Sequence, residues 1–393
     1  MQILYVATKY DYGKPDQGFS FEHCNFFDAL RCLGFDILYF DYMSLLRKHG
    51  RTGMNQRLRE VVDAEKPGLM FTVLATDELD QNVIREISSN TDTVTLNWFC
   101  DDHWRFDDYS RHWAPCFNWV VTTAVSALPK YEKIGYRHAI KSQWACNHFL
   151  YRNHGLPLQY DVTFVGQPHG NRRELIQHLQ AVGIKVRVWG TGWDSGRLSQ
   201  EEMIKVFGQS RINLNLSNSV IKIESRSEHL ANTGKRLVSR SLDAVPGGER
   251  LKSVAKRALL KSSQISASAP IVRIRTPASR TLYVDQIKGR NFEVPGCGGF
   301  MLTGRPENLE EYYDIGNEIV CYENTEDLIE KIRYFLDHEK ERSDIALAGY
   351  HRTIREHTYA QRFTKIFAEM ELPSVCLTSG DGKSLVSQVE EIS

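Results

Sequence analysis

The chain alternates short hydrophobic runs with longer stretches in which hydrophobic residues recur every three or four positions. The short runs are typical of buried strands and the longer spacing of amphipathic helices. In the first half, strands are predicted at 3–7, 35–40, 69–75, 93–99 and 119–124, and helices at 21–32, 54–65 and 81–88. This order favours a parallel sheet covered by helices on both faces.

The same alternation restarts after a connector at 148–160 that contains a Gly and a Pro. Further strands are predicted at 160–166, 185–190, 211–217, 298–303 and 317–323, and helices at 171–183, after an N-cap at Asn324, and around 363–370. Two such units predict an α/β protein with two tandem Rossmann-like, doubly wound domains facing a cleft. Their expected bounds are 1–155 and 156–371, with a flexible tail at 372–393.

A basic segment at 219–282 interrupts the second unit. From 220 to 290 the chain carries 15 Lys or Arg and 5 Asp or Glu, a balance of +10, although the whole chain has 49 of each kind. We interpret the segment as an insertion, partly helical, which the fold does not require. Its charge predicts an anionic partner or surface.

Composition narrows the class of protein. With 41% hydrophobic and 25% charged residues, the chain is expected to fold rather than to be disordered. No apolar stretch approaches the roughly 18 residues of a membrane helix, and the run at 3–7 is shorter than that of a signal peptide. Eight cysteines without a C-x-x-C pair indicate reduced thiols rather than disulfides or a zinc site. A cytoplasmic location is therefore expected.

Glycines and polar residues gather where the predicted strands end. Gly18 follows the first strand, Gly166, Asn171 and Arg172 follow the first strand of the second unit, and Gly190 follows the next. Ligands of doubly wound sheets bind at these carboxyl ends, where helix N-termini attract anions. None of the loops matches G-x-G-x-x-G or the P-loop motif, which disfavours a standard dinucleotide or P-loop site, and each loop alone is better explained by ordinary turn glycines. Their presence in both units favours a nucleotide in the cleft.

Four charged residues lie together in the stretch "VDQIKGRNFEVPGCGGFMLT". Asp285 and Glu293 flank Lys288 and Arg290, and a helix is predicted to begin near Asn291. A carboxylate can accept two hydroxyl groups from a ribose or a sugar, and a cation beside a helix start can neutralise a diphosphate. A nucleotide sugar needs all of these groups. The alternative is a salt-bridge cluster on an exposed turn.

At this point the sequence resembles a known family. The stretches "YDVTFVGQPHGNRREL", "GRNFEVPGCGGFMLT", "EIVCYENTEDLIEKIRYFL" and "REHTYAQRF" resemble the C-terminal domain of glycosyltransferases related to the spore protein CgeB. That group belongs to the GT-B class, which includes glycosyltransferase family 4. The resemblance extends more weakly to "LNWFCDDHWRF" and "SQWACN" in the first unit.

The resemblance implies roles for the charged stretch. Family 4 enzymes carry E-x7-E where this chain has D-x7-E. Glu293 would then bind the ribose of the donor, and Asp285 would contact the donor sugar, although an Asp there reaches one methylene less far. The basic pair that binds the diphosphate is not evident, and its candidates are Lys288, Arg290, Arg172 and Arg173.

A second charged group, "CDDHWRFDD", follows a strand of the first unit. Asp101, Asp102 and His103 are expected to face the cleft from the acceptor side, as a catalytic base or as groups that position the acceptor. The alternative is a cluster that caps a helix. Paired Asp residues can also hold a divalent ion, as in single-domain transferases, but the second Rossmann-like unit argues against that use. No metal and no cofactor are expected.

The sequence thus predicts a GT-B glycosyltransferase that moves a sugar from a nucleoside-diphosphate sugar to an unknown glycan, protein or lipid-linked acceptor. The rival interpretation is a non-catalytic protein of the same fold that binds an anionic polymer or glycan through the basic insertion. That insertion has Tyr283 beside it and otherwise lacks aromatic residues, which disfavours base stacking on nucleic acid.

Overall fold

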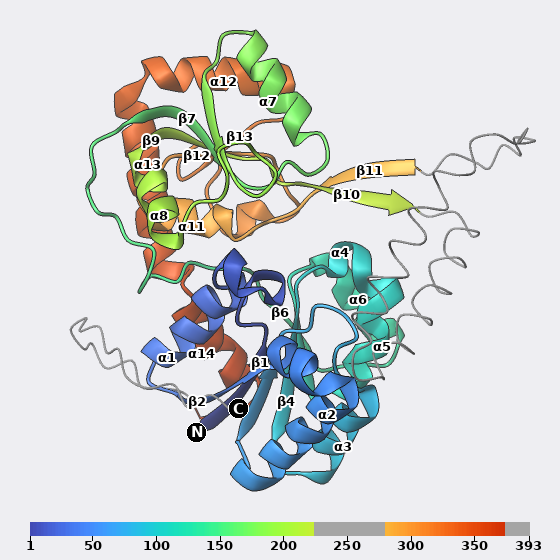
Figure 1. Ribbon diagram of the computed structural model, residues 1–393. Helices are drawn as coiled ribbons and strands as arrows, with labels where there is room; N and C mark the ends of the chain where they lie inside the picture. Colours follow the sequence, from blue (N-terminus) through green and yellow to red (C-terminus); the bar gives the residue numbers. More distant parts are fainter. Residues whose placement is uncertain (224–279, 374–393) are drawn as a thin grey trace, which may run out of the picture.

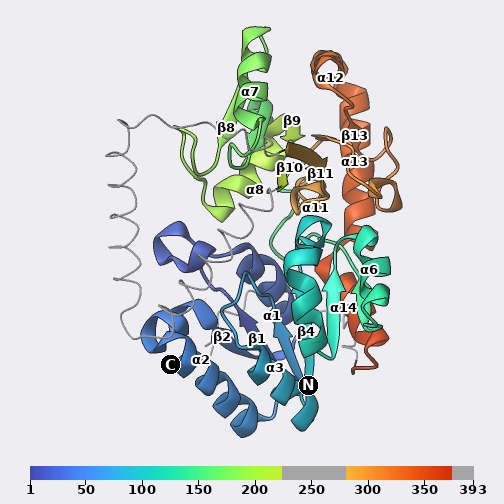
Figure 2. The same cartoon turned by 90° about the vertical axis from the view of Figure 1, so that its right-hand side faces the viewer.

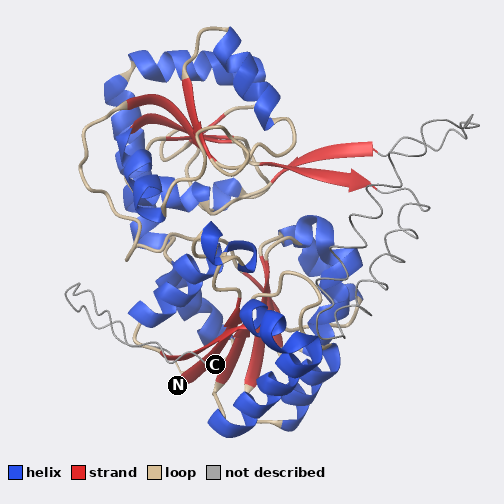
Figure 3. Cartoon of the chain, in the orientation of Figure 1, coloured by secondary structure: helices blue, strands red, loops and turns tan. Residues whose placement is uncertain are grey.

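The first strand, β1 (Gln2–Ala7), lies inside a six-stranded parallel sheet of strand order β2-β1-β3-β4-β5-β6. The structure is a computed structural model that describes residues 1–223 and 280–373. Helices cover both faces of this sheet and of a second sheet above it (Figures 1 and 3). The other strands of the first sheet are β2 (Asp36–Asp41), β3 (Leu69–Thr72), β4 (Val94–Phe99), β5 (Trp119–Thr122) and β6 (Ala139–Lys141).

The side chains of β1 pack alternately into two different hydrophobic cores. Leu4 and Val6 pack into one hydrophobic cluster and Ile3, Tyr5 and Ala7 into another, and all five are fully buried. Because side chains alternate across a strand, a strand buried on both sides needs a continuous hydrophobic run. The run at 3–7 therefore predicted this central strand correctly.

The helices of the first domain differ from the predicted ones mainly at their ends. The segment 21–32 forms a π-helical turn, η3 (His23–Phe27), and then α1 (Asp28–Cys32). The second helix begins twelve residues earlier than predicted, because Asp41 caps it and Gly50 with φ +69° kinks it instead of ending it. The helices after α1 in this domain are α2 (Tyr42–Glu65), α3 (Gln81–Asn90), α4 (Asp102–Arg105), α5 (Arg111–Trp113) and α6 (Leu128–Lys133).

The second sheet has the order β13-β12-β9-β7-β8 and is also parallel. Its strands are β7 (Tyr160–Val165), β8 (Val186–Trp189), β9 (Ser210–Asn215), β12 (Met301–Thr303) and β13 (Val320–Cys321). Its helices are α7 (Arg172–Ala181), α8 (Gln200–Gln209), α11 (Arg290–Gly296), α12 (Thr325–Asp337) and α13 (Glu339–Glu356). As predicted, Asn324 caps α12, since its side chain accepts from the backbone of Asp327 at 2.9 Å. The prediction of two doubly wound domains is confirmed.

The last helix, α14 (Tyr359–Glu369), crosses back to the first domain. Phe363, Ile366 and Phe367 are buried in the same core as Phe26 and Trp98. Figures 1 and 2 both show α14 beside the first sheet. The expected second domain of 156–371 included this helix, but its apolar face covers the first sheet. The chain therefore joins the two domains twice.

The two joining segments pair with each other. The backbone N–H of Cys146 donates to His357 at 2.9 Å, and the N–H of Tyr359 donates to Cys146 at 3.1 Å. The connector between the domains is thus tied to the segment that leads into α14.

The two ends of the expected insertion form strands. β10 (Asn218–Ile223) pairs antiparallel with β11 (Arg280–Asp285), as a ribbon that extends away from the second domain (Figure 1). These strands correct the expectation for both ends of 219–282, while 224–279 and nearly all of the expected tail lie outside the described residues.

Two further properties concern the whole of the described chain. None of its helices has the length and apolar composition needed to cross a membrane. Its seven cysteines are all free, and four of them are buried.

Candidate active site

A cavity of about 560 Å³ lies between the two domains. The first domain contributes residues from 11–25, after β1, and the second contributes 165–167, after β7, and 190–203, after β8. Tyr151 of the connector and Arg290 and Glu293 of α11 complete the lining. These segments follow the carboxyl ends of parallel strands, where doubly wound sheets bind ligands, and the volume is within the usual range for small-molecule sites.

Three of the predicted glycines line this cavity: Gly18, Gly166 and Gly190. Gly190 has φ +143°, and a Cβ atom there would lie 2.4 Å from the carbonyl oxygen of Gly166. The loops after β7 and β8 therefore approach so closely that only glycine fits. At Gly18, with φ +76°, the space is open and only the backbone conformation favours glycine.

Gly190→Ala is expected to lower the free energy of unfolding by about 1–3 kcal/mol, because the new methyl group would press on the Gly166 carbonyl in a strained backbone. Gly208→Ala is the control: it has ordinary helical geometry in α8, and its Cβ would meet nothing nearer than 3.6 Å. That change should be neutral or stabilising by up to about 1 kcal/mol. Urea unfolding measures both, and equal effects would contradict the close approach of the loops.

Glu293 lies at the floor of the cavity with no exposure to water. Its Oε1 accepts a hydrogen bond of 2.7 Å from the Tyr151 hydroxyl, and its Oε2 forms an ion pair with Arg290, whose side chain is 29% exposed. The salt bridge that the sequence offered as an alternative therefore exists, but it is buried rather than on an exposed turn. Each carboxylate oxygen keeps one further acceptor position, because an ionised carboxylate has about four.

The predicted helix start is close to correct, since α11 begins at Arg290. It is not open to a ligand in the way expected. A Cβ at Gly289 would lie 2.7 Å from the ring of Phe21, so a first-domain side chain covers this end of the helix. With seven residues, α11 also has only a small dipole. Side-chain cations are therefore the main positive charges at this point.

Lys288 lies where the two domains meet. Burial lowers the pKa of Lys288, nearby Arg172 lowers it further, and the carboxylate of Asp101 in the first domain opposes them. Burial and the Lys288 ammonium together lower the pKa of His103 to about 4. His103 is thus neutral at pH 7, and its Nδ1 has no hydrogen-bond partner among the residues that the structure describes.

Asp101, Asp102 and His103 do not act as one group. Asp101 precedes α4 as its N-cap residue, yet its side chain makes no capping hydrogen bond. Asp102 does not face the cleft: it is 1% exposed and accepts a 2.7 Å hydrogen bond from Tyr131 inside the first domain. Burial raises the pKa of Asp102, against opposing hydrogen bonds from neighbouring hydroxyl groups. Its expected catalytic role is therefore corrected to a structural one, because the first turn of α4 directs it into the core.

The cavity lining includes none of Lys288, Asp101 and His103, and it also excludes the remaining predicted residues. Asp285 ends β11, and a Cβ at Gly304 would lie 2.9 Å from its carboxylate. Asn171 is the N-cap residue of α7. Arg172 donates to the Gln167 carbonyl at 3.1 Å, and Arg173 donates to the Gly192 carbonyl at 2.6 Å. Both arginines thus brace the loops that form the wall of the cavity.

Sequence reasoning missed three residues of the site, namely Tyr151, Arg197 and Gln200. Arg197 forms an ion pair with Asp11 of the first domain, and Gln200 donates to the Tyr151 hydroxyl at 2.8 Å. All of them line the cavity. Arg197 and Gln200 lie ten residues or fewer beyond Gly190, which was a usable signal, whereas nothing in the pattern around Tyr151 distinguished it.

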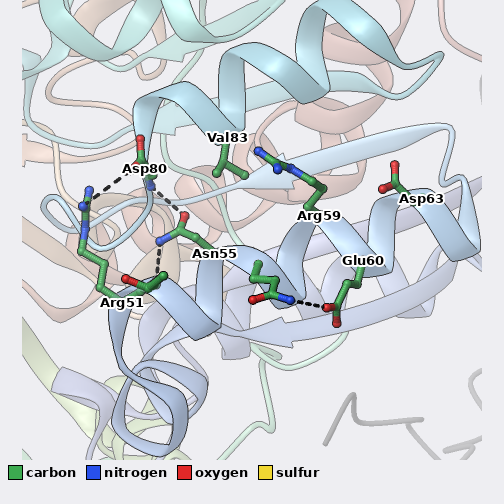
Figure 4. A pocket seen from close by; sticks show the side chains of 9 residues that line it. Arg51, Asn55, Arg59, Glu60, Asp63, Asp80 and Val83 are labelled. Carbon is green, nitrogen blue, oxygen red and sulfur yellow. Dashed lines mark hydrogen bonds and ion pairs between the residues drawn. The ribbon is translucent and has the colours of Figure 1, made fainter. Parts of the chain in front are cut away.

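A second cavity lies on the first domain between α2 and α3 (Figure 4). Its two arginines are paired with acidic neighbours: Arg51 with Asp80, and Arg59 with Glu86. It lacks the cluster of unpaired groups that marks a ligand site. Within the described ranges, no group of three or more His, Cys, Asp or Glu side chains is placed to hold a metal ion.

The two facing domains and the cleft between them define a protein of the GT-B class. Similar solved structures are Alr3699/HepE of Anabaena in complex with UDP-glucose (10% identity, TM-score 0.58, covering 94% of this chain and 99% of that one) and sucrose-phosphate synthase of Thermosynechococcus elongatus (8%, 0.53, 94% and 100%). At such identities the similarity establishes the fold.

The sequence comparisons identify the family. The glycosyl transferase-like family matches residues 172–241 and 240–368, about half of the chain, and the chain belongs to this family. The chain is also 21% identical over 251 residues to the spore protein CgeB of Bacillus subtilis (strain 168), across 63% of this chain and 67% of that protein. The predicted resemblance to CgeB-like glycosyltransferases is confirmed.

Proposed function

We propose that this protein transfers a hexose from a UDP-sugar to a hydroxyl group of an acceptor. The observation that carries the proposal is the cavity between the domains, with a buried carboxylate and an arginine at its floor. Structures of similar fold were obtained with UDP and with UDP-glucose. A uridine diphosphate offers a ribose for Glu293 and two phosphates for nearby cations.

In this reaction the acceptor oxygen forms a bond to the anomeric carbon, and the bond between that carbon and the phosphate oxygen breaks. UDP leaves with the bonding electrons, and the acceptor proton passes to a base or to water. Negative charge develops on the diphosphate, so fixed cations that face it lower the barrier. We assign this task to Arg290, the first residue of α11, and to Lys288, which lies two residues before it.

The first domain would hold the acceptor. Asp101 lies near enough to Lys288 to influence its pKa, and the neutral imidazole of His103 can accept or donate a hydrogen bond to a sugar hydroxyl. We assign these two residues to the acceptor side of the transferred sugar. Asp285, beside Gly304 at the end of β11, remains the proposed contact of the donor sugar.

We propose further that the reaction needs no metal ion, because side-chain cations can neutralise the leaving diphosphate. The alternative, a non-catalytic protein that binds an anionic polymer, rests on the basic insertion, most of which lies outside the described residues. Release of UDP from UDP-hexose by the purified protein, with a candidate acceptor, would favour the enzyme.

The expected result of a first test is that UDP raises the melting temperature by several degrees in the presence of EDTA. Ligand that binds only the native state stabilises it by about 2.7 kcal/mol at 100 times its Kd. Uridine at the same concentration is the control and should act more weakly, because it lacks the diphosphate. No shift with millimolar UDP would refute the donor site, and a shift that requires Mg²⁺ would refute metal independence.

A further inference from the structure

Tyr151 lies in the connector between the domains and reaches into the donor cavity. Its ring is 1% exposed, and its hydroxyl is placed between Gln200 and Glu293. Gln200 Nε2 donates to the hydroxyl oxygen at 2.8 Å, and the hydroxyl donates to Glu293 Oε1 at 2.7 Å. The amide of Gln200 is a donor here and the carboxylate can only accept, so the direction of this chain of hydrogen bonds is determined.

This chain and the Arg290 ion pair together hold the carboxylate in one orientation. Tyr151 binds one oxygen of Glu293 and Arg290 binds the other. Burial, together with the charge of Glu293, raises the pKa of Tyr151 well above its ordinary value, so the hydroxyl keeps its proton and remains a donor. A carboxylate held at both oxygens, with one acceptor position left on each, is arranged for two neighbouring hydroxyl groups such as those of a ribose.

The connector turn that carries Tyr151 is anchored to the first domain. The N–H of Tyr151 donates to the carbonyl of Asn147 at 2.8 Å. The buried Asn147 side chain donates to the carbonyl of Cys24 at 2.8 Å and to the carboxylate of Asp28 at 2.9 Å. The position of Tyr151, and through it that of Glu293, therefore depends on the first domain as well as the second.

We propose that Tyr151 is a positioning residue for the donor nucleoside: from the connector, it orients the Glu293 carboxylate toward the two ribose hydroxyls. This inference rests on the proposed function. It gives Tyr151 a role in donor affinity, and Gln200 supports this role through its hydrogen bond to the Tyr151 hydroxyl.

Tyr151→Phe removes the hydroxyl and keeps the ring. The expected result is a five- to tenfold rise in the Kd for UDP and in KM for the donor, with kcat changed less than twofold. Tyr313→Phe is the matched control, because it removes another buried hydroxyl of the second domain, which bonds to Thr353 at 2.7 Å and not to Glu293. That control should leave the Kd for UDP within twofold of wild type.

A double-mutant cycle separates positioning from a purely structural role. If Tyr151 acts through Glu293, then adding Tyr151→Phe to Glu293→Gln should change the Kd for UDP little further. Additive effects would overturn the proposal, and so would a less stable Tyr151→Phe protein that binds UDP as tightly as wild type.

Two more measurements distinguish failure of this inference from a folding defect and from failure of the proposed function. If Tyr151→Phe fails to fold, Gln200→Leu at the cavity wall is measured instead, with an expected two- to threefold rise in the Kd for UDP, and an unchanged Kd would refute the role. Wild-type protein that does not bind UDP in calorimetric titration would refute the proposed function itself and this inference with it.

Discussion

Replacement of Lys288 by methionine is expected to lower kcat by about 100- to 1,000-fold, since loss of one group that faces developing negative charge has effects of that size. Lys288 lies next to the first domain, near His103 and Asp101, and its ammonium donates to Gln286. Burial, which lowers its pKa, also strengthens its interaction with a phosphate. Methionine keeps most of the length of the side chain and removes the charge.

The measurement is the rate of UDP release at saturating donor, with Lys205→Met as the control. Lys205 lies on α8, is about half exposed and pairs with Glu201 on the same helix. This control should keep wild-type kcat. A Lys288→Met enzyme with normal kcat and a raised KM would show that Lys288 binds the donor equally in the ground and transition states.

Glu293→Gln is expected to weaken UDP binding by about 10- to 150-fold, equivalent to about 1.5–3 kcal/mol. The change removes the charge and replaces one acceptor oxygen with a donor, so two ribose hydroxyls can no longer both be accepted. The change should also lower stability, because Arg290 would lose its buried partner, and we expect a loss of about 1–3 kcal/mol in the free energy of unfolding.

Glu318→Gln is the matched control, because Glu318 is also shielded from water, with 18% of its side chain exposed, and pairs with Arg352, and neither residue lines the cavity. It should cost some stability and leave the Kd for UDP unchanged in calorimetric titration. If Glu293→Gln lowers stability to a similar degree and binds UDP as wild type does, then Glu293 is only the ion partner of Arg290.

The sequence predicted the strands of both sheets well, because buried parallel strands require continuous hydrophobic runs, as at 3–7 and 160–166. It missed β6, which has three residues, and it missed α8 and α13. Only four residues of α13 are buried, among them Arg342 and Thr353. A helix that buries polar residues and glycine has no clear hydrophobic period, so pattern reading does not detect it.

The sequence predicted only part of the candidate site, because it indicates where strands end but not where single side chains point. Carboxyl ends of parallel strands meet at one edge, so the order of strands and glycines was enough to place Gly18, Gly166 and Gly190 around one cavity. The direction of a single side chain depends on the turn that carries it. Asp101 and Asp102 are adjacent and chemically identical, yet only Asp102 points into the core of its domain.

The sequence by itself determined the fold class, the family and the stretch that carries Glu293, because these depend on periodicity and on local motifs. The tertiary structure decided which domain α14 completes and which neighbours the Glu293 carboxylate has. Tyr151 is 142 residues from Glu293 along the chain. Contacts of this kind form only when both domains and their connector are packed together, so no local pattern encodes them, and they are the contacts that orient the Glu293 carboxylate.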